Sequence, residues 1–117
     1  MDLDSAIQNH KIWDILFRNA IRNKGALDEA MIAQDHCCPL GQWLHGKGKA
    51  EYGKLRSFKN CVLNHASFHV EATKLFQAIN EENYAAAEEM LGKDSKYSIA
   101  SNKVVGAIME LKNEANL

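Results

Sequence analysis

Apolar residues recur at three- and four-residue steps along most of the chain, and proline and glycine interrupt this spacing at only a few points. The pattern predicts an all-α protein without strands, internal repeats or low-complexity linkers. We expect two or three long antiparallel helices, with short pieces between residues 27 and 48. Such helices pack as a four-helix-bundle-like fold, here with a short extra helix.

The first long helix is predicted from a cap at Asp4 and Ser5 to about Asn23, and residues 24–25 end it. Its inward stripe places two polar side chains among apolar ones, and it consists of Leu3, Ile7, His10, Asp14, Phe17 and Ile21.

The second long helix is predicted from about Glu51 to Ile79, and histidines again stand where leucines are expected. Its stripe consists of Leu55, Phe58, Val62, His65, His69, Ala72, Phe76 and Ile79. Residues 84–91 form a further helix after the polar stretch "NEEN", and an amphipathic pattern predicts a last helix over residues 97–115. Gly92 either breaks these two helices apart or kinks them.

Length, charge and cysteine content narrow the class of protein. The 117 residues, 46% hydrophobic, suit one domain over residues 1–117. A net charge of -1 without a basic run predicts neither nucleic-acid binding nor membrane-surface binding, and no apolar run allows membrane insertion. The N-terminus lacks a signal peptide, so we expect a cytoplasmic protein. Three cysteines cannot close a disulfide framework, and in a reducing compartment thiols favour metal or redox roles.

The stretch "CPLGQWL" at residues 38–44 places a thiol at the start of a predicted short helix. Proline is favoured at the first helical position, so this helix begins at Pro39 and closes at Gly46 or Gly48. Cys38 is then its N-cap, where unpaired N–H groups and the helix dipole favour the thiolate. Cys38 is therefore a candidate metal ligand, whereas we expect Cys37 and Cys61 to take no part.

Three histidines complete a candidate zinc site. His65 and His69 are four residues apart, so both rings leave the same helix face and one metal can bridge them. His10 adds a third imidazole and Cys38 a thiolate, which is the number of ligands that tetrahedral zinc needs. Each histidine alone is more often a hydrogen-bonded core residue, but buried imidazoles one turn apart are costly without partners or a metal. His36 and His45 are expected to be exposed.

These residues resemble a known family. His10 with Trp13, "CPLGQWL" as C-x-L-G-x-W, and "HASFH" resemble, in order and spacing, the chemoreceptor zinc-binding (CZB) domain over about residues 10–76. The resemblance implies the ligands His10, Cys38, His65 and His69. It also implies a cytoplasmic, typically homodimeric helical module of bacterial chemoreceptors, diguanylate cyclases and related signalling proteins. Members of the family are associated with sensing zinc, and with sensing hypochlorous acid through the zinc-bound cysteine.

Two features depart from this family pattern. Cys37 lies next to the ligand position and could act as an alternative thiolate or an oxidation partner. No output domain is attached, so the chain is either an excised domain or a stand-alone protein, and the chemoreceptor or cyclase output lies in cis or in trans.

A four-ligand site points to sensing rather than catalysis. It implies one zinc per chain and leaves no open position for an activated water, so we expect no enzyme. Oxidation of Cys38, or loss of zinc, would release the short helix at residues 39–44. Asp14 and Asp35 could accept the second ring N–H of a zinc-bound histidine.

Two other functions stay open at this stage. The first is a metal-free helical adaptor or dimerisation module with His65 and His69 as core residues. The second is a hemerythrin-like iron protein. This sequence lacks the Glu-x-x-His motifs of helical-bundle iron sites, and an iron site of that kind would leave Cys38 unused. A second apolar side of the first helix favours a homodimer; it consists of Ile12, Trp13, Leu16 and Ala20.

Overall fold

The computed structural model describes residues 2–25 and 39–116, and this part of the chain forms helices and no strand. The all-α fold predicted from the sequence is therefore confirmed for the described residues. In chain order the helices are α1 (Leu3–Asn23), α2 (Pro39–Leu44), α3 (Lys47–Tyr52), α4 (Arg56–Asn80), α5 (Tyr84–Met90) and α6 (Lys96–Ala115).

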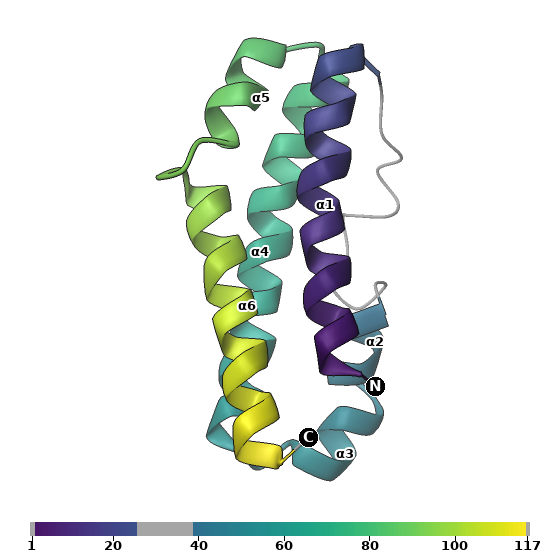
Figure 1. The fold of residues 1–117 in the computed structure, drawn as a ribbon, viewed down its shortest axis with the longest axis vertical. Helices are drawn as coiled ribbons and strands as arrows, with labels where there is room; N and C mark the ends of the chain where they lie inside the picture. Colours follow the sequence, from purple (N-terminus) through teal and green to yellow (C-terminus); the bar gives the residue numbers. More distant parts are fainter. Residues whose placement is uncertain (1, 26–38, 117) are drawn as a thin grey trace.

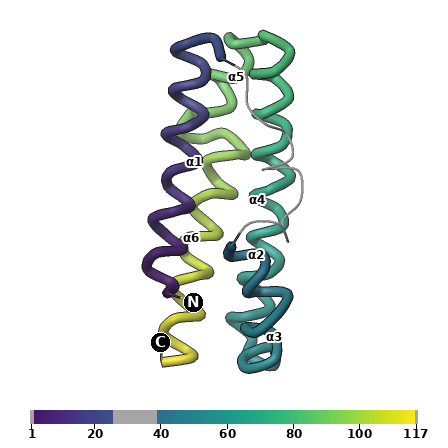
Figure 2. The backbone as a smooth tube through the Cα atoms, turned by 90° about the vertical axis from the view of Figure 1, so that its right-hand side faces the viewer, coloured from purple at the N-terminus to yellow at the C-terminus, as the bar shows by residue number. Residues whose placement is uncertain are grey.

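The three long helices α1, α4 and α6 run side by side, and the short α5 continues the column of α6 (Figure 1). The largest contact between any two helices is that of α4 with α6. The short helices α2 and α3 lie beside the first half of α4, at the end of the bundle where α1 begins (Figure 2). The first half of α1, the start of α2 and the middle of α4 converge on one small cavity.

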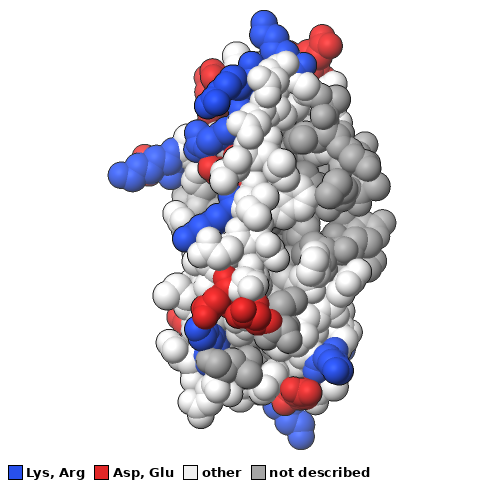
Figure 3. Space-filling view, turned by 45° about the vertical axis from the view of Figure 1, so that its right-hand side comes forward, with Lys and Arg blue, Asp and Glu red and all other residues white. Residues whose placement is uncertain are grey.

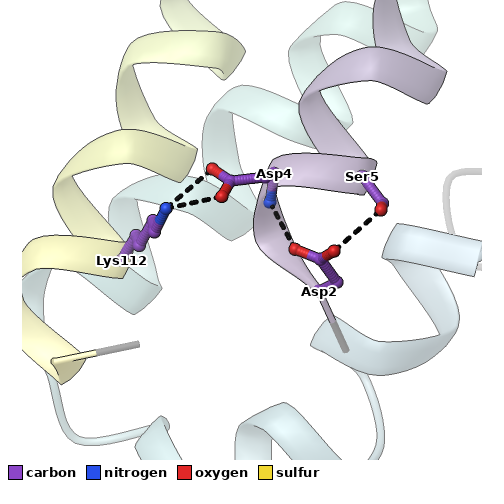
Figure 4. Close-up of polar contacts among 4 residues, drawn as sticks. All are labelled: Asp2, Asp4, Ser5 and Lys112. Atoms are coloured by element: carbon purple, nitrogen blue, oxygen red, sulfur yellow. Dashed lines mark hydrogen bonds and ion pairs between the residues drawn. The ribbon is translucent and has the colours of Figure 1, made fainter.

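The start of α1 differs from the prediction by two residues. The cap is Asp2, whose backbone is extended and whose carboxylate accepts from the Asp4 N–H at 3.0 Å and from the Ser5 hydroxyl at 2.9 Å (Figure 4). The cap predicted at Asp4 and Ser5 was wrong because both residues already belong to the first turn. Asp4 instead bonds Lys112 of α6, with 2.7 Å from the ammonium nitrogen to each carboxylate oxygen.

The remaining boundaries mostly follow the sequence pattern. Helix α1 ends at Asn23 as predicted, and Lys24 takes the left-handed conformation at φ 52°. Gly92 lies in a real break, because α5 ends at Met90 and α6 begins only at Lys96. The new helix has its own cap: the Ser95 hydroxyl accepts from the Ser98 N–H at 3.1 Å.

The predicted start of the second long helix at Glu51 was wrong. Glu51 belongs to α3, and an extended residue, Leu55, separates α3 from α4. A backbone N–H in the first turn of α4 finds its hydrogen-bond acceptor on α6. One carboxylate oxygen of Glu114 accepts from the Ser57 N–H at 3.2 Å and from the Ser57 hydroxyl at 2.7 Å. A cap supplied from another helix gives no local sequence signal.

Aromatic side chains fill the centre of the bundle. Phe17 and Phe68 expose at most 1% of their surface, and each packs against Tyr97 of α6 with ring centroids 5.7 Å apart. Among the described helices, none combines the length and the apolar character that crossing a membrane requires. The only buried imidazoles in the described core, those of His10, His65 and His69, lie in or beside this aromatic cluster.

Candidate metal centre

Two histidines on α4 form a close buried pair. His65 and His69 expose 2% and 4% of their surfaces, and their ring centroids lie 4.6 Å apart. Their four-residue spacing places both rings on the inward face of α4, because one helical turn takes about 3.6 residues. The two Nε2 atoms face each other at 3.2 Å.

The Nε2 separation fits two chemical states. Two imidazole nitrogens on a tetrahedral zinc, each about 2.0–2.1 Å from the metal, lie roughly 3.3 Å apart. A hydrogen bond between two neutral imidazoles has a similar length, with one Nε2 carrying the proton and the other accepting it. The pair is therefore able to share a proton or, when both Nε2 atoms are deprotonated, to bind one metal ion.

His10 comes to the same region from α1. Its ring exposes 6% of its surface and packs on Phe68, with centroids 3.9 Å apart and an angle of 55° between the planes. The buried Nε2 atom of His10 has no hydrogen-bond partner among the described residues. Burial, and next the charge of His69, lower the pKa of His10 to about 4. At neutral pH the ring is consequently uncharged, which is the form that binds metals.

The three histidines line one small cavity where α1, α2 and α4 meet. Its volume is about 40 Å³, and its other lining residues are Ala6, Asn9, Trp13, Pro39 and Leu40. That is more than the roughly 10–15 Å³ that a single water needs on this measure. Residues 2–25 and 39–116 contain no group of three His, Cys, Asp or Glu side chains close enough to hold an ion. The described histidines thus share a cavity without forming a complete site.

The cysteine predicted as fourth ligand lies outside the described residues, as do Asp35, His36 and Cys37. Pro39, the residue that follows Cys38, opens α2 and lines the histidine cavity. The predicted start of this short helix is confirmed. Position 38 is therefore one peptide unit away from a residue of the cavity wall.

The other predicted residues are placed as follows. Asp14 accepts from the Arg18 guanidinium at 2.8 Å, and its role toward His10 stays a prediction. His45 is exposed, as expected. Cys61 has no exposed surface, and burial raises the pKa of its thiol to about 12, so it stays protonated at neutral pH.

Two aromatic residues beside the histidines were not singled out as site residues in the sequence. Phe68 packs on His10 and also on His69, with 5.6 Å between the latter centroids. Tyr97 also packs on Phe68, and its buried hydroxyl has no hydrogen-bond partner within the described part of the chain. Phe68 stands inside the "HASFH" motif, which is a usable signal, whereas Tyr97 is brought in by α6 and has none.

A helical bundle that buries imidazole nitrogens around a small cavity at a helix junction has the architecture of a helical metal-binding module. The comparison with protein families specifies the class. The family model described as the chemoreceptor zinc-binding domain matches residues 10–76, more than half of the chain, and the chain belongs to this family. Neither the curated proteins nor the solved structures gave a match. The matched stretch begins at His10 and includes positions 38, 65 and 69.

Proposed function

We propose that the protein is a zinc-binding sensory module in which His10, Cys38, His65 and His69 hold one zinc ion per chain. The observation that carries the proposal is the 3.2 Å separation of the His65 and His69 Nε2 atoms, beside a cavity that His10 also lines. The buried Nε2 of His10, for which the described residues offer no partner, supports the same role. Buried polar atoms without partners are costly, and a metal ion would satisfy them.

Zinc with four protein ligands provides a crosslink and a stabilised thiolate instead of an activated water, so the protein is not an enzyme. The chain's own residues prepare the crosslink. Phe68 fixes the His10 ring by direct packing. Pro39, the residue bonded to Cys38 in the chain, lines the cavity.

The helix after Cys38 is the element that changes on sensing. Leu40 and Leu44 anchor α2 in the core with 7% and 1% of their surfaces exposed, and Trp43 packs on Phe58 with 6.0 Å between centroids. Cys38 alone ties this segment to the metal. When zinc is scarce, or when Cys38 is oxidised, that tie is lost and α2 keeps only its apolar contacts.

The oxidant in the second case is hypochlorous acid. The Cys38 thiolate attacks its chlorine and hydroxide leaves, and water then displaces chloride from the resulting sulfenyl chloride to give a sulfenic acid. A sulfenic acid is a poorer zinc ligand than a thiolate, so oxidation and zinc loss converge on one structural change. The module is cytoplasmic and homodimeric, and it regulates a chemoreceptor or a diguanylate cyclase in cis or in trans.

The test is a titration of zinc-loaded protein with hypochlorous acid while a chromogenic chelator reports free zinc. The wild type and Cys37→Ala are expected to release about one zinc per chain, as a single four-ligand site implies. Amide exchange in residues 39–48 is expected to rise at the same oxidant ratio. Zinc release without any change in this exchange would contradict the release of α2, and release that needs Cys37 would move the redox role to that residue.

A metal-free adaptor is the second candidate, because a hydrogen bond between two neutral imidazoles also explains the Nε2 separation. In that case a strong chelator would leave the melting temperature unchanged. A hemerythrin-like iron site gains no support, since none of the described residues lining the cavity carries a carboxylate.

A further inference from the structure

Basic side chains gather at one end of the bundle, where α3 and the start of α4 lie (Figure 1). Residues 47–59 hold five of the fourteen Lys and Arg of the chain but only one of its fifteen Asp and Glu. The five are not consecutive, so the sequence shows no basic run, and it is the fold that places them at one end of the molecule. This end is therefore cationic in a chain whose net charge is -1.

Four of these basic side chains have no charged partner among the described residues. They are all exposed, and we call them the lysine end: Lys47, Lys49, Lys54 and Lys59. The ion pairs within the described part of the chain all use cations outside residues 47–59. Arg56 is not included, because it lines a surface cavity together with Glu110 and Glu114. The lysine end consequently offers four ammonium groups to a partner.

The lysine end is in direct contact with α2, the helix that the proposed sensing step releases. The Trp43 ring of α2 lies so close over Gly48 that a Cβ there would be 2.7 Å from its Cδ2 atom. Gly48 stands in α3 between Lys47 and Lys49. Helix α2 therefore packs on the stretch of backbone that carries two of the four lysines, and its release would let these two move relative to the lysines that follow.

We propose that the lysine end binds an acidic segment of the signalling protein that this module regulates, and that it binds this segment more tightly while zinc holds α2 in place. The nature of the partner rests on the proposed function, whereas the surface rests on the lysines alone. Unpaired ammonium groups attract carboxylates and steer their approach. Because partner binding and zinc binding are linked through α2, the partner in turn favours the zinc-bound form.

The surroundings of the lysine end favour a short acidic segment over a large polyanion. Figure 3 shows Lys and Arg side chains projecting from the lower end of the molecule, with Asp and Glu side chains close to them. The basic area is therefore small. A membrane or a nucleic-acid duplex would extend past it and meet these carboxylates, and like charges repel within a screening length of about 8 Å.

Apolar and aromatic side chains lead to the same choice. The large exposed apolar residues of the described chain lie outside residues 47–59, so this segment has nothing to insert into a membrane. The Trp43 and Tyr52 rings pack against each other, with centroids 6.1 Å apart, instead of standing free to stack on bases. Carboxylates on a protein segment are the anions that this surface fits.

Fluorescence anisotropy of a labelled peptide of alternating glutamate and serine tests the surface. The zinc-loaded wild type is expected to bind the peptide, and Lys49→Glu with Lys54→Glu is expected to weaken binding roughly tenfold. The matched control is Lys93→Glu with Lys103→Glu, which makes the same change of net charge at two exposed lysines elsewhere. Circular dichroism and zinc content confirm that each variant is folded and loaded. A wild type that does not bind the peptide, or equal affinities of the two double variants, would overturn this inference and leave the proposed function standing.

The same titration tests the class of partner and the link to zinc. A DNA duplex and vesicles of phosphatidylserine and phosphatidylcholine are expected to bind more weakly than the peptide at the same salt concentration, and tighter binding of either would overturn the acidic segment as partner. Removing zinc with a chelator is expected to weaken peptide binding, and equal affinities with and without zinc would overturn the link through α2. A wild type that takes up no zinc but binds the peptide through the lysine end would overturn the proposed function and leave this surface standing.

Discussion

Gly48 and Gly106 both lie within helices, and replacing each by alanine is expected to change stability in opposite directions. Gly106 is exposed on α6, and an added Cβ would have no atom within 4 Å apart from the helix's own backbone. Alanine in a helix interior is favoured over glycine by about 1 kcal/mol. Gly106→Ala is therefore expected to raise the free energy of unfolding by about that amount.

The same change at Gly48 meets the ring of Trp43. Gly48 is buried in α3, and an added Cβ would lie 2.7 Å from Cδ2 and 2.8 Å from Cε2 and Cε3 of that indole. The ring cannot move freely, because it also packs on Tyr52 and Phe58 at centroid distances of 6.1 and 6.0 Å. Overpacking of this kind costs about 1–3 kcal/mol, which exceeds the helical gain of about 1 kcal/mol. A net loss of about 1 kcal/mol follows.

The assay is urea denaturation of the zinc-free proteins, followed by far-UV circular dichroism so that a moved tryptophan does not distort the signal. The two variants are expected to differ by about 2 kcal/mol, with the wild type between them. Zinc affinity should fall only in Gly48→Ala, because Trp43 positions α2 beside the histidine cavity. Equal stabilities of the two variants would refute the packing argument.

Three further predictions concern the buried polar groups. Tyr97→Phe is expected to leave the free energy of unfolding unchanged or to raise it, because the buried hydroxyl it removes has no described partner; a loss above about 1 kcal/mol in urea titrations would contradict this. Burial lowers the pKa of His10 from 6.5 to about 4, so its contribution to the stability of the zinc-free protein is present above pH 6.5 and is lost toward pH 4. Urea titrations of His10→Phe should show a free energy of unfolding that depends less steeply on pH over this range than that of the wild type. An equally steep dependence would contradict the lowered pKa of His10. Zinc should displace the proton between the Nε2 atoms of His65 and His69. The ¹⁵N NMR chemical shifts of both Nε2 atoms are then expected to change on zinc addition. Chemical shifts that zinc leaves unchanged would contradict metal binding by the pair.

Much of the fold was accessible from the sequence because its signals are local. The apolar spacing located the long helices, and Pro39 marked the start of α2. The histidines stood out because they interrupt apolar stripes, and the structure buries all three around one cavity. Local periodicity is sufficient for such features, since a side chain's face follows from its position in the helix.

The features that the sequence missed depend on contacts between distant residues. The Glu114 carboxylate that caps α4 at Ser57 comes from the last turn of α6. The packing of Phe68 on Tyr97 likewise joins two helices whose relative placement no local pattern encodes. The cap of α1 is a different case, because Asp2, Asp4 and Ser5 are all good capping residues, and only the structure shows that Asp4 and Ser5 both donate to Asp2.

The most direct test of the central claim is the zinc content of purified protein, measured by elemental mass spectrometry. The wild type and Cys37→Ala are expected to contain about one zinc per chain, whereas His65→Ala and Cys38→Ala retain a small fraction of it after dialysis. Cys61→Ala is the matched control on α4, because its thiol is buried and protonated. A purified wild type that contains no zinc, or a zinc content that is the same with and without His65, would contradict the account.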